Sequence, residues 1–499
     1  MKTLRYLFSL LVVAVAFTAC KDEDLSPYID YNGVNTPIGI NTEQVQMHTF
    51  WTDTVAISTE MAANWRASSS ASWCRIEHQP GTPSTKALNV ITDLNRTYEA
   101  RTATITFEYI HDTSVKKVVT ITQPGKVKYA YTNENASAPE GMKKNAMFLL
   151  KHIKVGWNLG NSFEADGDET AWGNPVTTRD MIKGVKAAGF NAIRIPVRWC
   201  VRADEKLNIK PEAMARIKEV VDWAIAEDMY VVLNSHHDQW YDRMDSTKYV
   251  DDVVNENFKQ MWTQIAETFK SYDEHLIFAG MNEVIERVNG NENWGSYTEK
   301  TLKRQQTLAQ IFVDAVRANG GNNAWRNLMI QPMAASADFA LQSDFVMPKD
   351  NVKERLILEF HYYQPYSYAG GGATNGFWGA PYETLDGAYV NGESELADKM
   401  FYIQTKFVDN GYPCIMGEFG SVAHLEDLEH MNSQAYFLKN VVKSAKDHSF
   451  PAFLWDNNLQ GSTDGENMGY LNRNDGMNPY FPMFIKGVMD GAAEGKYTY

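Results

Sequence analysis

The fold is decided by runs such as Leu276-Ile277-Phe278-Ala279-Gly280-Met281-Asn282-Glu283, which is apolar until its last two residues. Strands that are buried on both faces have this composition, and they are typical of parallel sheets. Beyond Met142 the sequence contains eight such runs, which are Ile153–Asn158, Ala192–Pro196, Tyr230–Asn234, Leu276–Asn282, Asn327–Gln331, Leu356–His361, Pro413–Glu418 and Ala452–Asp456. The sequence therefore predicts eight buried strands.

Amphipathic segments separate these runs. One begins at Pro211, a residue that suits the first turn of a helix, and carries apolar residues at three-to-four spacing: Met214, Ile217, Val220, Val221, Ala224 and Ile225. A second segment repeats the pattern at Phe258, Met261, Trp262, Ile265 and Phe269. Alternating strands and helices imply a parallel sheet covered by helices, and eight such units predict an α/β fold that closes as a (β/α)₈ TIM barrel.

The preceding part of the chain has a different pattern. Residues 103–109 alternate apolar and polar side chains, and residues 117–123 form a matching segment, as expected for paired, half-buried strands. We therefore predict a small all-β sandwich over residues 41–125, with Trp65 and Trp73 in its core. A linker is expected at residues 126–141, and the barrel domain at residues 142–499.

The first residues are typical of an export signal. Lys2 and Arg5 precede a short apolar run that ends before Cys20, and this run is too short to cross a bilayer. It resembles the lipobox of bacterial lipoproteins, which implies a signal peptide at residues 1–19, lipidation of Cys20 and a linker at residues 20–40. The acidic stretch 21–24 resembles the export signal of Bacteroidetes surface lipoproteins, although a solvated linker has the same composition. The expected location is the outer membrane, with the chain facing the cell exterior.

Charge and cysteine content exclude several classes of function. The formal net charge of −15 repels phosphate backbones, so no nucleic-acid partner is expected. Lipidation of Cys20 would leave three of the four cysteines, and an odd number argues against a disulfide framework in an exported chain. No Cys-x-x-Cys pair is present, so a cysteine zinc site is unsupported.

Two of the predicted strands end in glutamate, Glu283 on the fourth and Glu418 on the seventh. A single glutamate at a strand end is most often capped or ion-paired, but these two strands lie across the barrel mouth from one another. Glycoside cleavage with retention needs opposed carboxylates about 5–5.5 Å apart, one that protonates the leaving oxygen and one that attacks the anomeric carbon. We assign Glu283 as acid/base and Glu418 as nucleophile.

Polar and aromatic residues end the other strands. Arg194 is placed to hold Glu418 ionised, and Asn282 is able to hydrogen-bond a sugar hydroxyl. His236 and His237 are adjacent, so on an extended segment their side chains point to opposite sides and disfavour a two-histidine metal site. The remaining strand-end candidates are His361, Tyr363 and Trp455, of which Trp455 offers a flat face for a pyranose.

The ordered set of motifs resembles glycoside hydrolase family 5, and closely its subfamily 4. The matching segments are Gly156–Asn161, Trp172–Pro175, Arg194–Val197, His236-His237, Asn282-Glu283, Gly320–Asn323, His361–Tyr363, Gly417–Gly420 and Trp455–Asn457. The resemblance implies the two glutamate roles above, no metal or other cofactor, and a substrate site formed by Asn161, Trp172, Arg194, His236, His237, Asn282, His361, Tyr363 and Trp455. The N-terminal sandwich resembles the BACON domain, an immunoglobulin-like family.

The paired carboxylates are expected to differ in pKa. A charge from Arg194 should keep Glu418 ionised, while Glu283 faces a neighbouring carboxylate and should hold its proton longer. The two groups should titrate as a coupled pair and give a bell-shaped pH profile.

The subfamily resemblance implies internal cleavage of β-1,4-glucan, so the expected partner is a polysaccharide. The membrane is a second expected partner, through the lipid on Cys20, and glycan-uptake proteins of the outer membrane are further candidate partners. Xyloglucan is favoured because the loop at residues 363–378, with Tyr366, Tyr368 and Phe377, suggests a broad mouth for branched chains. The alternatives are mixed-linkage glucan, cellulose, mannan or xylan. A non-catalytic glycan-capture lipoprotein would need a broken glutamate pair, but both glutamates are present. A metal hydrolase would need a His-x-His on its first strand, and residues 153–158 contain none.

Overall fold

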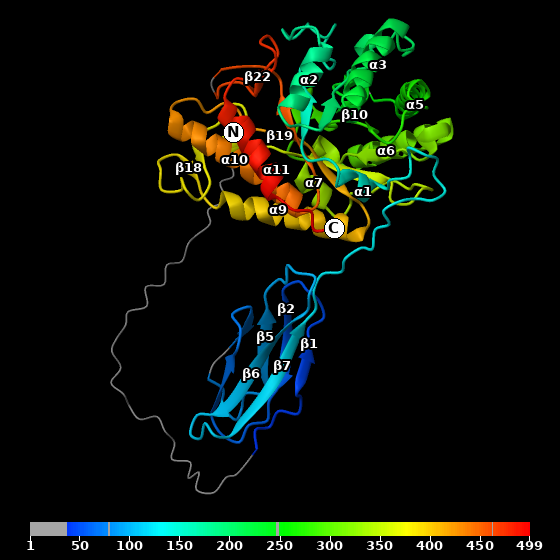
Figure 1. Cartoon of the computed structure of the whole chain (residues 1–499). Coiled ribbons are helices and arrows are strands. Elements are labelled where there is room, and N and C mark those ends of the chain that lie inside the picture. Colours follow the sequence, from blue (N-terminus) through cyan, green and yellow to red (C-terminus); the bar gives the residue numbers. More distant parts are fainter. Residues whose placement is uncertain (1–36, 78–79, 246–248, 462) are drawn as a thin grey trace, which may run out of the picture. The chain divides into compact units, whose positions relative to one another are not determined.

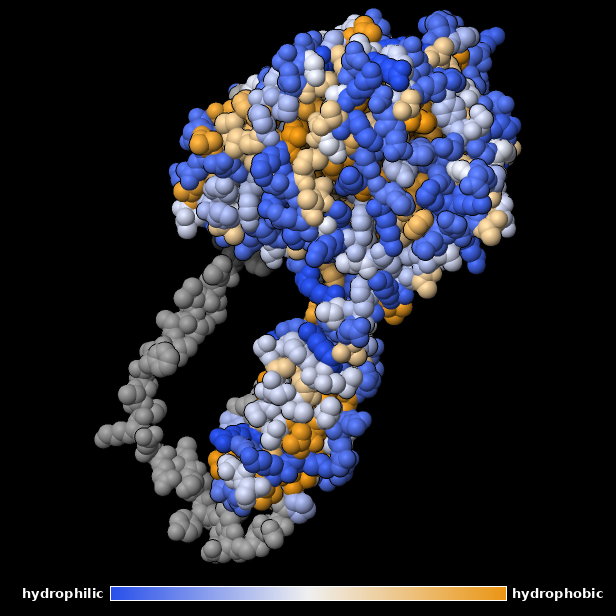
Figure 2. Space-filling view, in the orientation of Figure 1, coloured by the Kyte–Doolittle hydropathy of each residue, from blue (hydrophilic) through white to orange (hydrophobic). Residues whose placement is uncertain are grey.

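The computed structural model describes residues 37–77, 80–245, 249–461 and 463–499. It contains two compact units, one that ends at Gly125 and one that spans Lys126–Tyr499 (Figure 1). The predicted signal peptide and lipidation site at Cys20 lie outside the described residues. Among the helices that are described, none is both long and apolar enough to cross a membrane. Figure 2 shows a face of the larger unit that is mostly hydrophilic, with apolar residues scattered across it.

The first unit is a β-sandwich, as predicted. One sheet has the order β1-β7-β6-β3 and the other β2-β5-β4. The strands are β1 (Gln44–Gln46), β2 (Asp53–Ser58), β3 (Trp65–Ser69), β4 (Cys74–Ile76), β5 (Ala87–Thr92), β6 (Arg101–Tyr109) and β7 (Lys116–Gln123). Trp65 is fully buried in the core between the sheets, and Trp73 packs against that core. Alternation of buried and partly exposed residues along β6 explains why the sequence indicated this fold.

The second unit is a closed barrel of eight parallel strands, which confirms the predicted fold. Each predicted apolar run overlaps one barrel strand, and β8, β16 and β19 extend one residue beyond the predicted run. The strands are β8 (Gly156–Leu159), β9 (Ala192–Ile195), β10 (Tyr230–Asn234), β12 (Leu276–Ala279), β15 (Leu328–Ile330), β16 (Leu356–Tyr362), β19 (Cys414–Phe419) and β20 (Ala452–Asp456). The pairing of β20 with β8 closes the ring, so the barrel has no exposed sheet edge.

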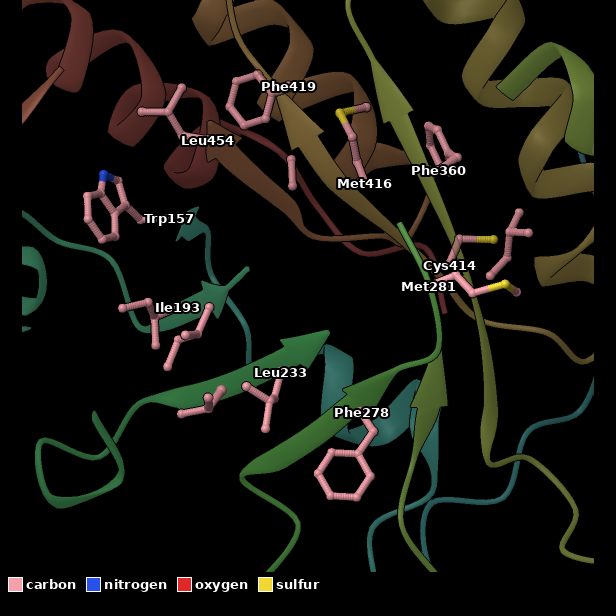
Figure 3. Packing of buried hydrophobic residues seen from close by; sticks show 14 of the residues in the cluster. Trp157, Ile193, Leu233, Phe278, Met281, Phe360, Cys414, Met416, Phe419 and Leu454 are labelled. Carbon is pink, nitrogen blue, oxygen red and sulfur yellow. The ribbon is translucent and has the colours of Figure 1, made fainter. Parts of the chain in front are cut away.

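A helix follows each barrel strand, and Figure 1 shows these helices around the barrel. They are α2 (Arg179–Ala187), α3 (Pro211–Ala226), α5 (Asp251–Thr268), α6 (Glu299–Asn319), α7 (Ala337–Leu341), α9 (Gly392–Lys406), α10 (Leu428–Asp447) and α11 (Pro482–Glu494). Strand residues such as Ile193, Leu233 and Phe278 belong to the large hydrophobic cluster that also contains the buried faces of the helices (Figure 3).

The barrel interior is apolar at one end only. Alternate strand residues, among them Val232, Ile277 and Phe453, form a separate buried cluster with Leu149 and Leu150. The two leucines belong to the short helix α1 (Ala146–Leu150), which precedes the first barrel strand. This packing fills the N-terminal end of the barrel and leaves polar chemistry to the C-terminal end.

Short elements follow the C-terminal ends of the strands. Three of them form a small sheet with the order β11-β13-β14, and the others form two-stranded ribbons or short helical turns. They are α4 (Gln239–Asp242), β11 (Arg243–Asp245), β13 (Ile285–Val288), β14 (Asn291–Asn293), α8 (Tyr366–Ala369), β17 (Phe377–Trp378), β18 (Ala388–Tyr389), β21 (Leu471–Asn472) and β22 (Asn478–Pro479). Single turns of 3₁₀ helix lie at Cys200–Arg202, Gly321–Ala324, Met333–Ala335 and Val408–Asn410.

The segment expected to be a linker, residues 126–141, packs within the barrel unit. Lys126 Nζ lies 2.9 Å from Asp409 Oδ2, and both side chains are buried. Tyr131 donates a hydrogen bond of 2.7 Å to the carbonyl of Val408. The polar residues Asn133, Asn135 and Ser137 with Pro139 suggested a linker. Lys126 and Tyr131 instead bind the segment to the loop that precedes β19.

A glycine in the first barrel strand gives a test of this packing. A Cβ atom at Gly156 would lie 2.1 Å from the Phe453 ring in the barrel interior. We expect Gly156→Ala to lower the free energy of unfolding of the barrel by about 1–3 kcal/mol, because overpacking forces core side chains to shift. Gly295→Ala is the control, since no heavy atom lies within 4 Å of the added Cβ. Thermal unfolding followed by tryptophan fluorescence measures both, and equal melting temperatures would contradict the packing.

Candidate active site

The two predicted catalytic glutamates meet at the C-terminal end of the barrel with a histidine between them. Glu283 follows β12, Glu418 lies on β19 and His361 lies on β16. His361 Nδ1 is 2.7 Å from Glu283 Oε1 and 3.5 Å from Glu418 Oε2. One oxygen of each glutamate and one ring nitrogen all lie within 4.8 Å of one another. This close approach fits a retaining pair better than an inverting pair, whose carboxyl groups lie roughly 6.5–9.5 Å apart.

The carboxylate of Glu418 is held at both oxygens. Arg194 on β9 donates from Nη1 to Oε1 at 2.7 Å, and Tyr363 donates from Oη to Oε2 at 3.0 Å. The other terminal nitrogen of Arg194 donates to Asn282 Oδ1 at 2.6 Å. Because Arg194 is fully buried, these contacts fix its guanidinium without competition from water. The arrangement presents Glu418 in one orientation, as a nucleophile requires.

The two adjacent histidines lie beside this network. His236 Nε2 is 3.2 Å from Asn282 Nδ2, and burial holds the pKa of His236 well below its usual value. Burial also lowers the pKa of His237, to about 4. The prediction that their rings point to opposite sides is wrong: the rings meet edge to face with centroids 4.3 Å apart, because His237 adopts φ 56° and interrupts the extended backbone.

The remaining predicted substrate residues lie further out. Trp455 stacks on His236, with ring centroids 5.8 Å apart and planes inclined by 15°. Trp172 is 38% exposed and its ring lies 5.9 Å from His237. Asn161 adopts φ 58°, and its carbonyl accepts a hydrogen bond of 2.9 Å from Asn174. Asn161 therefore shapes the loop after β8, whereas Trp172 and Trp455 offer aromatic faces near the histidines.

Protonation of the pair differs from the expected order. Burial alone would lower the pKa of His361, but Glu418 and Glu283 outweigh it and raise that pKa to about 10. Burial raises the pKa of Glu418 despite the charges of His361 and Arg194. At Glu283 burial is outweighed by His361, which lowers the pKa. The prediction that Glu283 holds its proton longer is thus wrong for the unliganded site, because the sequence does not show that His361 binds Glu283.

Three further residues of the site were missed. Glu359 is a fully buried carboxylate inside β16, and its only sequence signal is one charge within the apolar run 356–360. Arg243 donates to the carbonyl of Glu283 at 3.0 Å, and its guanidinium lies 5.5 Å from the ring of Trp294. Trp294 is 45% exposed. A tryptophan in the polar stretch 289–296 was the available signal for this aromatic face.

Within the described residues, Glu283, His361 and Glu418 form the group with the composition of a metal site. A histidine binds a metal through a neutral ring nitrogen. His361 is protonated at neutral pH because its pKa is raised to about 10, so both ring nitrogens act as hydrogen-bond donors. The donor set suits a charge-compensated carboxylate pair better than it suits a cation.

Opposed glutamates at the C-terminal end of a closed β/α barrel define the class of the protein, a barrel glycoside hydrolase. Residues 158–461 match Cellulase (glycosyl hydrolase family 5), and residues 63–124 match BACON, described as a putative N-terminal binding domain. The chain belongs to glycosyl hydrolase family 5 and carries an N-terminal BACON domain.

Curated and solved relatives agree with this family. The chain is 30% identical over 479 residues to a xyloglucan-specific endo-β-1,4-glucanase of Bacteroides ovatus, with 91% of each chain covered. It is 35% identical over 355 residues to endoglucanase A of Clostridium longisporum, covering 68% of this chain and 64% of that protein. A Bacteroides ovatus xyloglucanase structure with a bound XXXG heptasaccharide superposes with a TM-score of 0.64 at 28% identity, covering 91% of this chain and 99% of that one.

The raised pKa of His361 makes stability depend on pH. The folded pKa of about 10 exceeds the ordinary value of 6.5, so the stabilisation is complete below about pH 6.5 and is lost as the pH rises toward 10. We expect the melting temperature of the wild type to fall over this range, and to fall less in His361→Gln. His48→Gln, at an exposed side chain of the sandwich, is the control and should follow the wild type. Identical slopes for wild type and His361→Gln in thermal melts would contradict the assignment.

Proposed function

We propose that the chain is a retaining endo-β-1,4-glucanase whose main substrate is xyloglucan. The observation that carries the proposal is the close approach of Glu283 and Glu418, since one carboxylate oxygen of each lies within 4.8 Å of the other at the mouth of the barrel. Arg194 and Tyr363 fix the carboxylate of Glu418 at both oxygens, which suits attack on the anomeric carbon. Glu283, bound by His361 through Oε1, is placed to serve the leaving oxygen.

The proposed reaction is a double displacement. The first step requires the proton shared by the pair to lie on Glu283, so that Glu418 attacks the anomeric carbon as a carboxylate. Glu283 then gives that proton to the departing glycosidic oxygen, and a covalent glycosyl ester forms. Formation of the ester removes the negative charge of Glu418 and lowers the proton affinity of Glu283. In the second step Glu283 takes a proton from water, and the water oxygen displaces Glu418 with overall retention.

Exposed aromatic residues on separate loops support internal cleavage of a long chain. They are Trp172 after β8, Trp294 after β14 and Tyr366, which is 61% exposed, at the start of α8. The expectation that Tyr368 and Phe377 line the mouth is wrong: both are buried, and Tyr368 stacks on His424 with ring centroids 4.2 Å apart. Stacking surfaces spread over several loops suit a polysaccharide better than a small glycoside.

The relatives favour xyloglucan as the substrate. The Bacteroides ovatus relative that matches both domains is named as xyloglucan-specific. A structure titled as a xyloglucan-specific β-1,4-glucanase from a ruminal metagenomic library superposes with a TM-score of 0.65 at 32% identity, covering 71% of this chain and 98% of that one. The second candidate is a glucanase of broader range. A structure of a broad-specificity endoglucanase of Ruminococcus champanellensis with bound cellotriose also matches, with a TM-score of 0.61 at 35% identity. The match covers 69% of this chain and 98% of that one.

The first prediction for this function concerns substrate range. We expect the wild type to shorten xyloglucan faster than mixed-linkage glucan, carboxymethylcellulose, mannan or xylan, measured as new reducing ends and product size. Glu418→Gln keeps the shape of the side chain but removes the nucleophile, and we expect it to lower the rate on xyloglucan by about 10³-fold or more. Equal rates on all β-glucans would support the broader glucanase, and binding without cleavage by the wild type would support glycan capture.

The second prediction concerns stereochemistry. Because the glutamates are too close for a water molecule to attack from the opposite face, the first product should carry the β-anomer. Proton NMR of early products, recorded before mutarotation, measures the anomer directly. An α-anomer formed first would contradict a nucleophilic role for Glu418 and indicate inversion.

A further inference from the structure

The buried carboxylate of Glu359 contacts the two cationic side chains of the active site, Arg194 and His361. Its Oε1 lies 2.9 Å from Arg194 Nε and 3.5 Å from His361 Nε2. Its Oε2 accepts a hydrogen bond of 2.5 Å from Gln331 Nε2. The Glu359 side chain is 0% exposed, so it cannot contact the substrate. Any influence on the reaction must therefore act through its negative charge or through the groups that it contacts.

The neighbouring strand makes room for this carboxylate. A Cβ atom at Gly417 would lie 2.0 Å from Glu359 Oε1, so only glycine fits at the position before Glu418. Strand β16 supplies both Glu359 and His361, while β19 supplies Gly417 and Glu418. Glu359 thus occupies a space that the strand of the nucleophile leaves open for it.

The charges of this cluster do not balance unless it holds an extra proton. Five ionisable side chains meet here: the cations Arg194 and His361, and the carboxylates Glu283, Glu359 and Glu418. Glu466 and Arg243, which is itself paired with Glu292 at 2.9 Å, also act on Glu283 from outside this group. Two positive and three negative charges leave one negative charge in a buried site, and one proton shared by Glu283 and Glu418 removes it. Without the charge of Glu359, two cations would face two carboxylates, and the cluster would be neutral with no proton on the pair.

We propose that Glu359 is a positioning residue that keeps the catalytic proton in the site, because its buried negative charge supports protonation of His361 and of the Glu283–Glu418 pair. The inference rests on the proposed double-displacement function. Burial by itself would raise the pKa of Glu359, but Arg194 and His361 lower it, so this residue is an anion at neutral pH. The groups that face it are Arg194 of β9, Gln331 after β15, His361 of β16 and, beyond Gly417, Glu418 of β19.

Substitution of Glu359 by glutamine tests the proposal. Removal of a buried negative charge lowers the proton affinity of every neighbouring group, so both limbs of the pH profile of kcat/KM should move to lower pH by about one pH unit or more. A residue with a merely structural role would lower the rate equally at all pH values and leave the limbs in place. That result, with Glu359→Gln folded by circular dichroism, would overturn the proposal.

Two further variants separate charge from shape. Glu359→Gln combined with Gln331→Glu returns a carboxylate to the other end of the 2.5 Å hydrogen bond, and it should move the pH profile back toward that of the wild type. The matched control is Glu274→Gln, which removes a buried carboxylate that is paired with Lys144 before the start of β12. It should leave both limbs unchanged. A profile for the double variant that stays at the position of Glu359→Gln would contradict the role of charge.

A measurement that does not need activity distinguishes this inference from the proposed function. Histidine ring signals from ¹³C-labelled protein, assigned with His361→Gln, report the titration of His361 directly. We expect its midpoint to fall from about 10 in the wild type to a lower pH in Glu359→Gln. If the midpoint falls but the wild type cleaves no glycan, the proposed function fails and the charge coupling stands. If the wild type is active and the midpoint does not move, the inference about Glu359 fails.

Discussion

The buried guanidinium of Arg194 is the interaction on which the rest of the active site depends. It contacts side chains from four other parts of the barrel wall: Asn158 at 3.0 Å, Asn282 at 2.6 Å, Glu418 at 2.7 Å and Glu359 at 2.9 Å. A cation removed from water is costly unless anions and hydrogen-bond acceptors surround it. The barrel must therefore present these four side chains together, and in doing so it fixes the carboxylate of Glu418 and the amide of Asn282.

The pleat of the strands explains how the barrel combines an ionic site with an apolar interior. Ala192 and Arg194 are two residues apart on β9, so both side chains point inward at successive levels. The same relation holds for Ile357, Glu359 and His361 on β16. The first level belongs to the apolar cluster closed by α1, and the later levels carry the charges. Along the barrel axis, the interior is thus lined first by apolar side chains and then by ion pairs, which lie next to the open C-terminal end.

Sequence reasoning recovered the elements whose signal is local. Each barrel strand was visible because burial on both faces leaves an apolar run, and Glu283 and Glu418 were visible because they end such runs. The contacts between runs were not visible. Glu359 lies in mid-strand and needs Arg194 as its partner, and the proton on His361 depends on three carboxylates from different segments. The orientation of His237 depended on a single positive φ that the sequence pattern does not encode.

The errors about the active site have a common physical origin. A pairwise view, with Arg194 beside Glu418 and one carboxylate beside another, gives the wrong order of proton affinities because it omits His361 and Glu359. Buried charges interact strongly over several ångströms, so the protonation of any one group reflects the charge of the whole cluster. A cluster with one unbalanced negative charge holds a proton that its members share, and the proposed double displacement requires such a proton to move during the reaction. The same unbalanced charge lowers the stability of the folded state. The apolar side chains packed in the N-terminal end of the barrel offset this cost.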